Sequence, residues 1–198
     1  MPHDLHDFFY PRTVALIGAT DKTFKPARAI LENLAHFDGA VFPVNPKHET
    51  LLGHRCYPSV SAIPEPIDLA LVALPAPLVE QELERLREKG VKRVILISSG
   101  FAEAGEQGLA MQRRIAEITK QYGIRVIGPN ALGVYNTDNG LDSFFVSRER
   151  VSRPAPGRLS IISQSGAITV ILMEALARDN MGIAKAVNYG NRLDIDDA

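Results

Sequence analysis

The stretch TVALIGAT, from Thr13 to Thr20, decides the fold of this chain. It is an apolar run rich in β-forming residues, and it stops at Gly18. A stretch with apolar residues at helical spacing follows from Ala27 to Phe37. The sequence therefore predicts a buried strand that ends in a glycine turn and is followed by a helix.

The same alternation of strand and helix continues along the chain. Runs that are apolar throughout, as in strands covered on both faces, lie at 40–45, 67–74, 92–100 and 124–130. Charged amphipathic segments typical of helices separate the last three runs, at 77–90 and after Gly100. Since each parallel crossover needs a covering element, we expect an α/β fold with a doubly wound parallel sheet.

A linker interrupts this rhythm before the last part of the chain. The segment SRERVSRPAPG, from Ser147 to Gly157, combines charges, two prolines and a glycine. We predict one domain over 1–147, a linker over 148–157 and a second domain beginning at 158. Strands at 158–162 and 184–187 and a helix from about Ala167 cannot close a core alone, so we expect the second domain to be truncated at 198.

Composition narrows the classes of partner. The 198 residues are 45% hydrophobic and 23% charged, with a formal net charge of -1. This charge gives no strong attraction for a nucleic acid or an anionic membrane surface. Backbone amides can still bind a small molecule that carries phosphate. The single cysteine, Cys56, excludes intramolecular disulfides, and the N-terminus has no secretory pattern. We expect a cytoplasmic protein.

Small, polar or proline residues end every predicted strand. In a parallel sheet these endings gather at one edge, where ligands bind in a crevice. The five endings are Gly18-Ala19-Thr20, Pro43-Val44-Asn45-Pro46, Leu74-Pro75-Ala76, Ser98-Ser99-Gly100-Phe101 and Gly128-Pro129-Asn130.

The first two endings resemble a dinucleotide site with two departures. Gly18 supplies the tight turn of G-x-G-x-x-G, but Thr20 and Thr23 occupy the later glycine positions. After the second strand stands Lys47, where an acidic residue would bind the ribose of NAD. A lysine favours a ligand with an additional phosphate. Two plainer interpretations remain: turn chemistry at Gly18 and a solvated surface lysine at Lys47.

A second anion site is predicted at SQSG, from Ser163 to Gly166, where a strand leads into a helix with unpartnered N–H groups. A serine hydrolase is disfavoured because G-x-S-x-G requires glycine at position 163. The five histidines show no metal-ligand spacing. Acids at Asp194, Asp196 and Asp197 are better explained as a solvated helix start, so we predict neither a metal site nor a catalytic residue.

An ordered set of motifs carries a family resemblance. FFYPRTVALIGAT, VFPVNPKHETLLGHRCYPSV, DLALVALPA, ISSGFAEAGEQG, GIRVIGPNALGVYNT, PGRLSIISQSGAI and NYGNRLDIDD span nearly the whole chain. Together they resemble the acyl-CoA synthetases that form ADP or GDP, of the ADP-forming acetate–CoA ligase type. The succinyl-CoA synthetase α subunit is similar more distantly. Two departures are Lys25-Pro26-Ala27, where the family has a glycine, and Ala131, where cysteine is common.

The resemblance implies a Rossmann-like CoA-binding domain followed by the beginning of a flavodoxin-like domain. By position, it assigns Gly18, Ala19 and Thr20 to the CoA phosphates and Pro43, Asn45 and Lys47 to the adenosine end. It assigns the pantetheine path to Leu74, Pro75, Ala76, Ser98, Ser99, Gly100 and Phe101, and places Asn130 near the thiol. Ser163, Gln164, Ser165 and Gly166 would hold a phosphoryl group.

The implied function is the CoA-binding portion of an acid:CoA ligase. Such an enzyme forms acyl-CoA from a carboxylate, CoA and ATP or GTP, with Mg, through acyl phosphate and phosphohistidine, and releases the nucleoside diphosphate and phosphate. An ATP-grasp domain or subunit would be the partner, a homo-oligomer is possible, and this chain alone is expected to be inactive. The alternatives are the sensor region of a protein lysine acetyltransferase, a stand-alone CoA- or nucleotide-binding module, and an NAD-dependent dehydrogenase.

Overall fold

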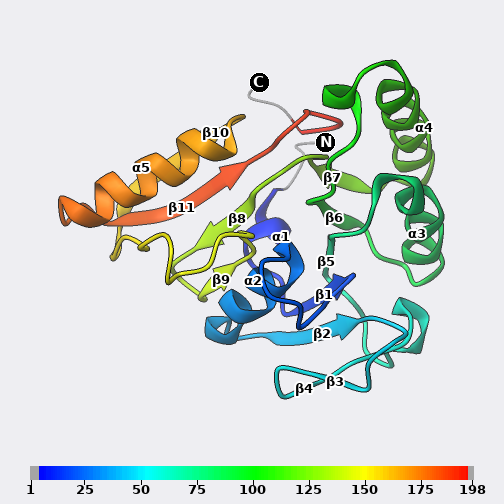
Figure 1. The fold of residues 1–198 in the computed structure, drawn as a ribbon, viewed down its shortest axis with the longest axis horizontal. Coiled ribbons are helices and arrows are strands. Elements are labelled where there is room, and N and C mark those ends of the chain that lie inside the picture. Colours follow the sequence, from blue (N-terminus) through cyan, green and yellow to red (C-terminus); the bar gives the residue numbers. More distant parts are fainter. Residues whose placement is uncertain (1–4, 196–198) are drawn as a thin grey trace.

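The computed structural model describes residues 5–195 and contains two main sheets (Figure 1). The helices are α1 (His6–Phe9), α2 (Pro26–Asn33), α3 (Ala76–Glu88), α4 (Glu106–Tyr122) and α5 (Gly166–Arg178). The strands are β1 (Thr13–Ile17), β2 (Ala40–Val44), β3 (Thr50–Leu51), β4 (His54–Arg55), β5 (Leu69–Val72), β6 (Arg93–Leu96), β7 (Arg125–Ile127), β8 (Gly133–Asn136), β9 (Leu141–Asp142), β10 (Pro156–Ser163) and β11 (Ile183–Asn188).

The first sheet has five strands in the order β2-β1-β5-β6-β7, and all its pairings are parallel. From β1 the chain first moves outward to β2 and then returns to the other side of β1 with β5. The order therefore reverses between β1 and β5, which is where doubly wound sheets bind ligands. The predicted fold class, a Rossmann-like doubly wound sheet, is confirmed.

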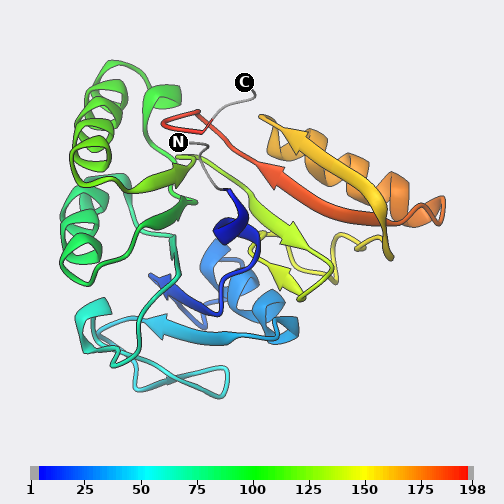
Figure 2. The ribbon, with the colours of Figure 1, turned by 180° about the vertical axis from the view of Figure 1, so that it is seen from behind.

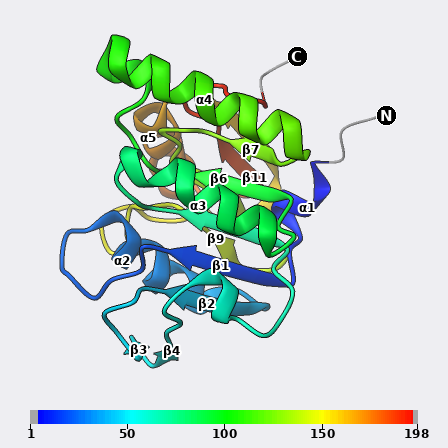
Figure 3. The ribbon, with the colours of Figure 1, turned by 90° about the vertical axis from the view of Figure 1, so that its right-hand side faces the viewer.

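Helices cover both faces of this sheet (Figure 3). On one face, Val79 and Leu83 of α3 and Ile115 of α4 pack against strand residues such as Val72. On the other face, α1, α2 and β8 contribute a separate apolar cluster. The strands are almost entirely buried, as continuous apolar runs between two helical layers should be.

The second sheet has four strands in the order β10-β11-β8-β9. Its pair β10 and β11 is parallel, whereas β11 with β8 and β8 with β9 are antiparallel. Seen from behind, β10 and β11 project away from the first sheet and α5 lies along them (Figure 2). This sheet draws strands from both sides of the predicted linker. The division at 148–157 stays a prediction.

Several short elements were not predicted, and one boundary differs. The sequence pattern placed a helix over 27–37, but α2 ends at Asn33 and its last turn continues as a 3-10 helix over Leu34–His36. The short hairpin of β3 and β4, which includes His54, was not predicted. Over residues 5–195, none of the helices has the length and apolarity that crossing a bilayer demands.

Candidate functional site

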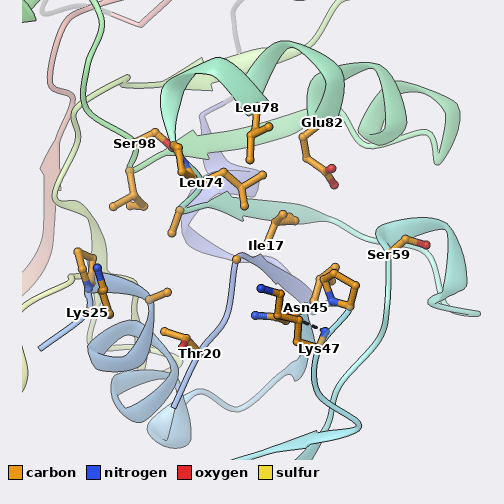
Figure 4. Close-up of a pocket in the computed structure, with 18 of the residues that line it drawn as sticks. Ile17, Thr20, Lys25, Asn45, Lys47, Ser59, Leu74, Leu78, Glu82 and Ser98 are labelled. Carbon is orange, nitrogen blue, oxygen red and sulfur yellow. Dashed lines mark hydrogen bonds between the residues drawn. The ribbon is translucent and has the colours of Figure 1, made fainter. Parts of the chain in front are cut away.

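A pocket of about 810 Å³ opens at the carboxyl edge of the first sheet (Figure 4). Its volume suits a drug-sized or cofactor-sized ligand. Residues from the ends of β1, β2, β5 and β6 line it, together with the start of α2 and one side of α3. The predicted site residues among them are Gly18, Thr20, Asn45, Lys47, Leu74, Pro75, Ser98 and Ser99.

The Gly18 turn brings the β1 ending close to the β5 ending. Gly18 has φ +84°, and a Cβ atom added there would lie 2.7 Å from the carbonyl oxygen of Ala73. Its N–H donates to the carbonyl oxygen of Val44 at 3.0 Å. After the turn, the Thr20 hydroxyl accepts a hydrogen bond from the Lys22 N–H at 3.2 Å. The backbone thus turns tightly between two strands, which only glycine permits without strain.

The β2 ending is tied to this turn by Asn45. The Asn45 side-chain amide donates to the carbonyl oxygen of Ala19 at 2.7 Å, and its Oδ1 accepts from the Lys47 N–H at 2.9 Å. These two bonds fix the loop that carries Lys47, whose side chain is exposed at the pocket (Figure 4).

Positive charge gathers at the pocket. Lys22, Lys25 and Lys47 all line it, and Lys25 is also the N-cap of α2, with Pro26 in the first turn. The first N–H groups of a helix have no intrahelical partners and carry the positive end of its dipole. The arrangement therefore suits a ligand with several phosphates. The sequence analysis missed Lys22 and Lys25 because neither lies at a strand end.

The remaining six predicted cofactor residues do not line the pocket. Ala19, Pro43 and Ala76 are buried, and the Phe101 side chain is fully enclosed in the core beneath α3 and α4. Within the pocket wall, the Ser98 hydroxyl donates to the carbonyl oxygen of Val72 at 3.3 Å, so it supports the wall. Gly100 and Asn130 are the other two residues outside the lining. The assignment of all fourteen residues to CoA stays a prediction.

Glu103 holds the loop that follows β6. Its Oε1 accepts hydrogen bonds from the N–H groups of Gly100 at 2.6 Å and Phe101 at 3.3 Å, and its Oε2 accepts from Asn191. Partial burial of the Glu103 carboxyl acts to raise its pKa, but these hydrogen bonds outweigh it and the pKa is lowered. The motif NYGNRLDI thus reaches back to the rim of the first sheet, where the Asn130 amide also donates to Asn191 at 3.5 Å.

The SQSG turn lies at the start of α5, outside the lining of the large pocket. Ser165 is the N-cap, and its hydroxyl accepts from the Ile168 N–H at 3.3 Å. The Ser163 hydroxyl accepts from the Ser165 N–H at 3.1 Å, so part of the predicted anion site already has internal partners. The buried Asn188 amide holds the turn from below by donating to the carbonyl oxygens of Ser163 and Gln164. Whether the turn binds phosphate stays a prediction.

Two other kinds of site, a metal centre and a cysteine nucleophile, find little support among the described residues. Among residues 5–195, no three histidine, cysteine or acidic side chains come together as a metal site would need. Asp196 and Asp197, considered above, lie outside the described residues. Burial raises the pKa of the Cys56 thiol, which lies beneath the β2 ending and is not poised as a nucleophile.

Similar proteins were found for both parts of the chain. The acetate–CoA ligase [ADP-forming] I of Archaeoglobus fulgidus is 40% identical over 96% of this chain and 27% of its own length. The α subunit of acetate–CoA ligase [ADP-forming] I of Pyrococcus furiosus is 39% identical over 98% of this chain and 42% of its own length. The chain therefore spans between about a quarter and two fifths of these relatives.

A solved structure shares the fold at similar identity. The acetyl-coenzyme A synthetase 1 of Ca. Korarchaeum cryptofilum, in complex with phosphate and ADP, superposes with a TM-score of 0.88 at 34% identity, over 98% of this chain and 41% of that one. Residues 156–198 match the model of the succinyl-CoA ligase like flavodoxin domain. Residues 12–137, more than half of the chain, match the CoA binding domain model, and the protein therefore belongs to the CoA-binding domain family.

Proposed function

We propose that this chain is the CoA-binding portion of an acid:CoA ligase that forms a nucleoside diphosphate. The observation that carries the proposal is the pocket at the switch point of the sheet, whose lining includes Lys22, Lys25 and Lys47. CoA carries a pyrophosphate and a 3′-phosphate, so three cations and a helix start match its charges. The relatives named above, which are ADP-forming ligases of acetate, support the same class of reaction.

Each part of CoA would have a counterpart among the residues that line the pocket or follow the same strands. The pyrophosphate would lie against the Gly18-Ala19-Thr20 turn and the start of α2, near Lys25. The adenosine 3′-phosphate would meet Lys47 at the β2 ending, beside Pro43 and Asn45. The pantetheine arm would then run past Leu74-Pro75-Ala76 and the loop from Ser98 to Phe101, with its thiol toward Asn130.

The complete reaction needs more than this pocket. A carboxylate, CoA and ATP or GTP would give acyl-CoA, nucleoside diphosphate and phosphate, through acyl phosphate and phosphohistidine. The turn from Ser163 to Gly166 would hold the phosphoryl group at the start of α5 while it moves between sites. An ATP-grasp domain or subunit would supply the nucleotide site, with Mg, and the whole would act in the cytoplasm.

Titration calorimetry with CoA and 3′-dephospho-CoA tests the role of Lys47. If Lys47 pairs with the 3′-phosphate, the intact protein should bind CoA roughly tenfold more tightly than dephospho-CoA, as for a hydrogen bond between charged groups. Lys47→Ala should remove this difference and leave the affinity for dephospho-CoA unchanged.

Lys25→Ala is the matched control, because Lys25 lies at the pyrophosphate end. It should weaken the binding of both ligands by a similar factor and keep their ratio. Equal affinities of the intact protein for the two ligands would refute the Lys47 assignment. Failure to bind either ligand would refute the proposed function.

A further inference from the structure

Glu82 is a buried acid that the proposed function has not yet used. It lies on the inner side of α3 and faces the pocket, which it lines together with its neighbours Leu78 and Arg85 (Figure 4). Only 4% of the residue is exposed. Acidic side chains are rarely buried so fully unless something pairs with them.

The pairing of Glu82 within the protein is incomplete. Its Oε2 accepts a hydrogen bond from Arg85 Nη1 at 3.1 Å, and the Arg85 side chain itself is about half exposed. Within residues 5–195, no donor reaches the other oxygen, Oε1. A carboxylate oxygen accepts hydrogen bonds and donates none, so Oε1 selects for a donor on whatever fills this part of the pocket.

The position of Glu82 indicates which part of a nucleotide it would meet. In doubly wound sheets the pyrophosphate lies at the first helix start and the ribose at the end of the second strand. The base at the far end of the nucleotide therefore lies on the side of the pocket away from that helix start. Here these landmarks are Lys25 and Lys47. Glu82 lines the pocket on the side of Lys47 and Ser59, opposite Lys25 and Ser98 (Figure 4). This side is therefore the slot for the base.

We propose that Glu82 is a specificity-determining residue that accepts a hydrogen bond from the exocyclic amino group of the adenine of CoA. The inference rests on the proposed binding of CoA at this pocket. The amino group of adenine is a donor, and it would supply the partner that Oε1 lacks. Oε1 is not one of the fully enclosed atoms, so it is open to the pocket. A base without that group would displace water from Oε1 without replacing its hydrogen bond, which loses affinity.

A CoA analogue with purine in place of adenine tests this pairing, because it lacks only the amino group. By titration calorimetry on the intact protein, CoA should bind roughly ten- to a hundredfold more tightly than the purine analogue. Glu82→Met keeps the length of the side chain and removes both oxygens, so it should bring this ratio close to one. Glu82→Gln, which keeps a neutral acceptor, should give an intermediate ratio.

Glu84→Met is the matched control. Glu84 lies on the same helix and forms the same kind of pair with an arginine three residues later, Arg87, but it does not line the pocket. In Glu84→Met, the ratio of the affinities for CoA and the purine analogue should equal that of the unaltered protein. A ratio near one in the unaltered protein, or an undiminished ratio in Glu82→Met, would overturn the inference while CoA binding itself stands.

A further outcome is that Glu82→Met loses the preference for CoA over dephospho-CoA and keeps the preference for CoA over the purine analogue. That result would also overturn the inference, because Glu82 would then act only by orienting Arg85, which lines the pocket and would approach the 3′-phosphate. Absence of CoA binding to the unaltered protein would instead reject the proposed function. The comparison of CoA with the purine analogue uses the unaltered protein, so it tests the inference even if a substitution at Glu82 prevents folding.

Discussion

At the scale of single residues, Gly18 shows how one position serves both the fold and the pocket. Its φ of +84° is shared by Gly53 and Gly90, but only Gly18 also has a neighbouring backbone oxygen, that of Ala73, within 2.7 Å of an added Cβ. The close approach of the β1 and β5 endings forms the floor of the pocket. Gly18 is therefore constrained twice, by conformation and by space.

Replacing Gly18 with alanine should destabilise the protein more than the same change at Gly53. The positive φ alone costs roughly 1–2 kcal/mol in either variant. Gly18→Ala adds the overlap with the Ala73 oxygen, and we expect a total loss of about 3 kcal/mol, typical of a strained buried site. Urea unfolding of both variants measures the difference, and equal losses would show that the two strands separate easily to admit a Cβ.

Part of the lining of the pocket was predictable from the sequence, although the binding roles of these residues stay predictions. Gly18, Asn45 and Lys47 line the pocket as expected, because parallel topology sends every carboxyl end to one edge. Phe101 was expected in the pantetheine path, but its side chain points into the core, and chain position alone does not give that direction. Glu82 was missed because a helical pattern does not reveal which side of α3 the pocket follows.

At the scale of elements, a buried ion pair fastens the segment after β9. Asp142 is fully buried, and Arg153 Nε lies 2.9 Å from its Oδ2. The same guanidinium donates at 2.7 Å to the carbonyl oxygens of Val146 and Val151. A segment whose composition predicted a linker is thus held against β9 by Arg153, and Arg148 pairs with the same carboxylate.

Arg153→Ala should cost about 3 kcal/mol of unfolding free energy. The change leaves a buried carboxylate with the Arg148 pair at 3.1 Å and the Phe144 N–H at 3.3 Å. Arg178→Ala serves for comparison, since the Arg178 pair with Asp179 is exposed and should contribute less than about 0.5 kcal/mol. Chemical denaturation of the two variants gives both values. A loss below 1 kcal/mol in Arg153→Ala would mean that solvent or Arg148 replaces the missing partner.

The long amphipathic helices and the apolar parallel strands were predictable, and the short strands β8 and β9 were not. The helices α3 and α4 carry apolar stripes over thirteen and seventeen residues, enough for the helical period to stand out. By contrast, β8 and β9 have four and two residues, too few for a period to be recognised. The pairing of β8 with β11 depends on a partner about fifty residues later in the chain, which local pattern cannot supply.

At the scale of the whole molecule, β8 joins the two sheets into a shared structure. Val134 packs with the core beneath the first sheet, whereas the next residue, Tyr135, packs with Phe144 and Met173 in the core of the second. Successive residues of a strand face opposite sides, so a single strand serves as a wall between two cores. The predicted boundary at 148–157 divides the sequence, but β8 connects the packing on either side of it.

The two cores should therefore unfold together. Urea denaturation followed by far-UV circular dichroism and by tyrosine fluorescence should give coincident curves with one midpoint, because β8 cannot leave one core while it stays in the other. Tyr135 reports on the second core and Tyr189 on the first, so Tyr135→Phe and Tyr189→Phe allow each fluorescence signal to be assigned. Two separate midpoints would contradict the shared wall and would support two domains that fold independently.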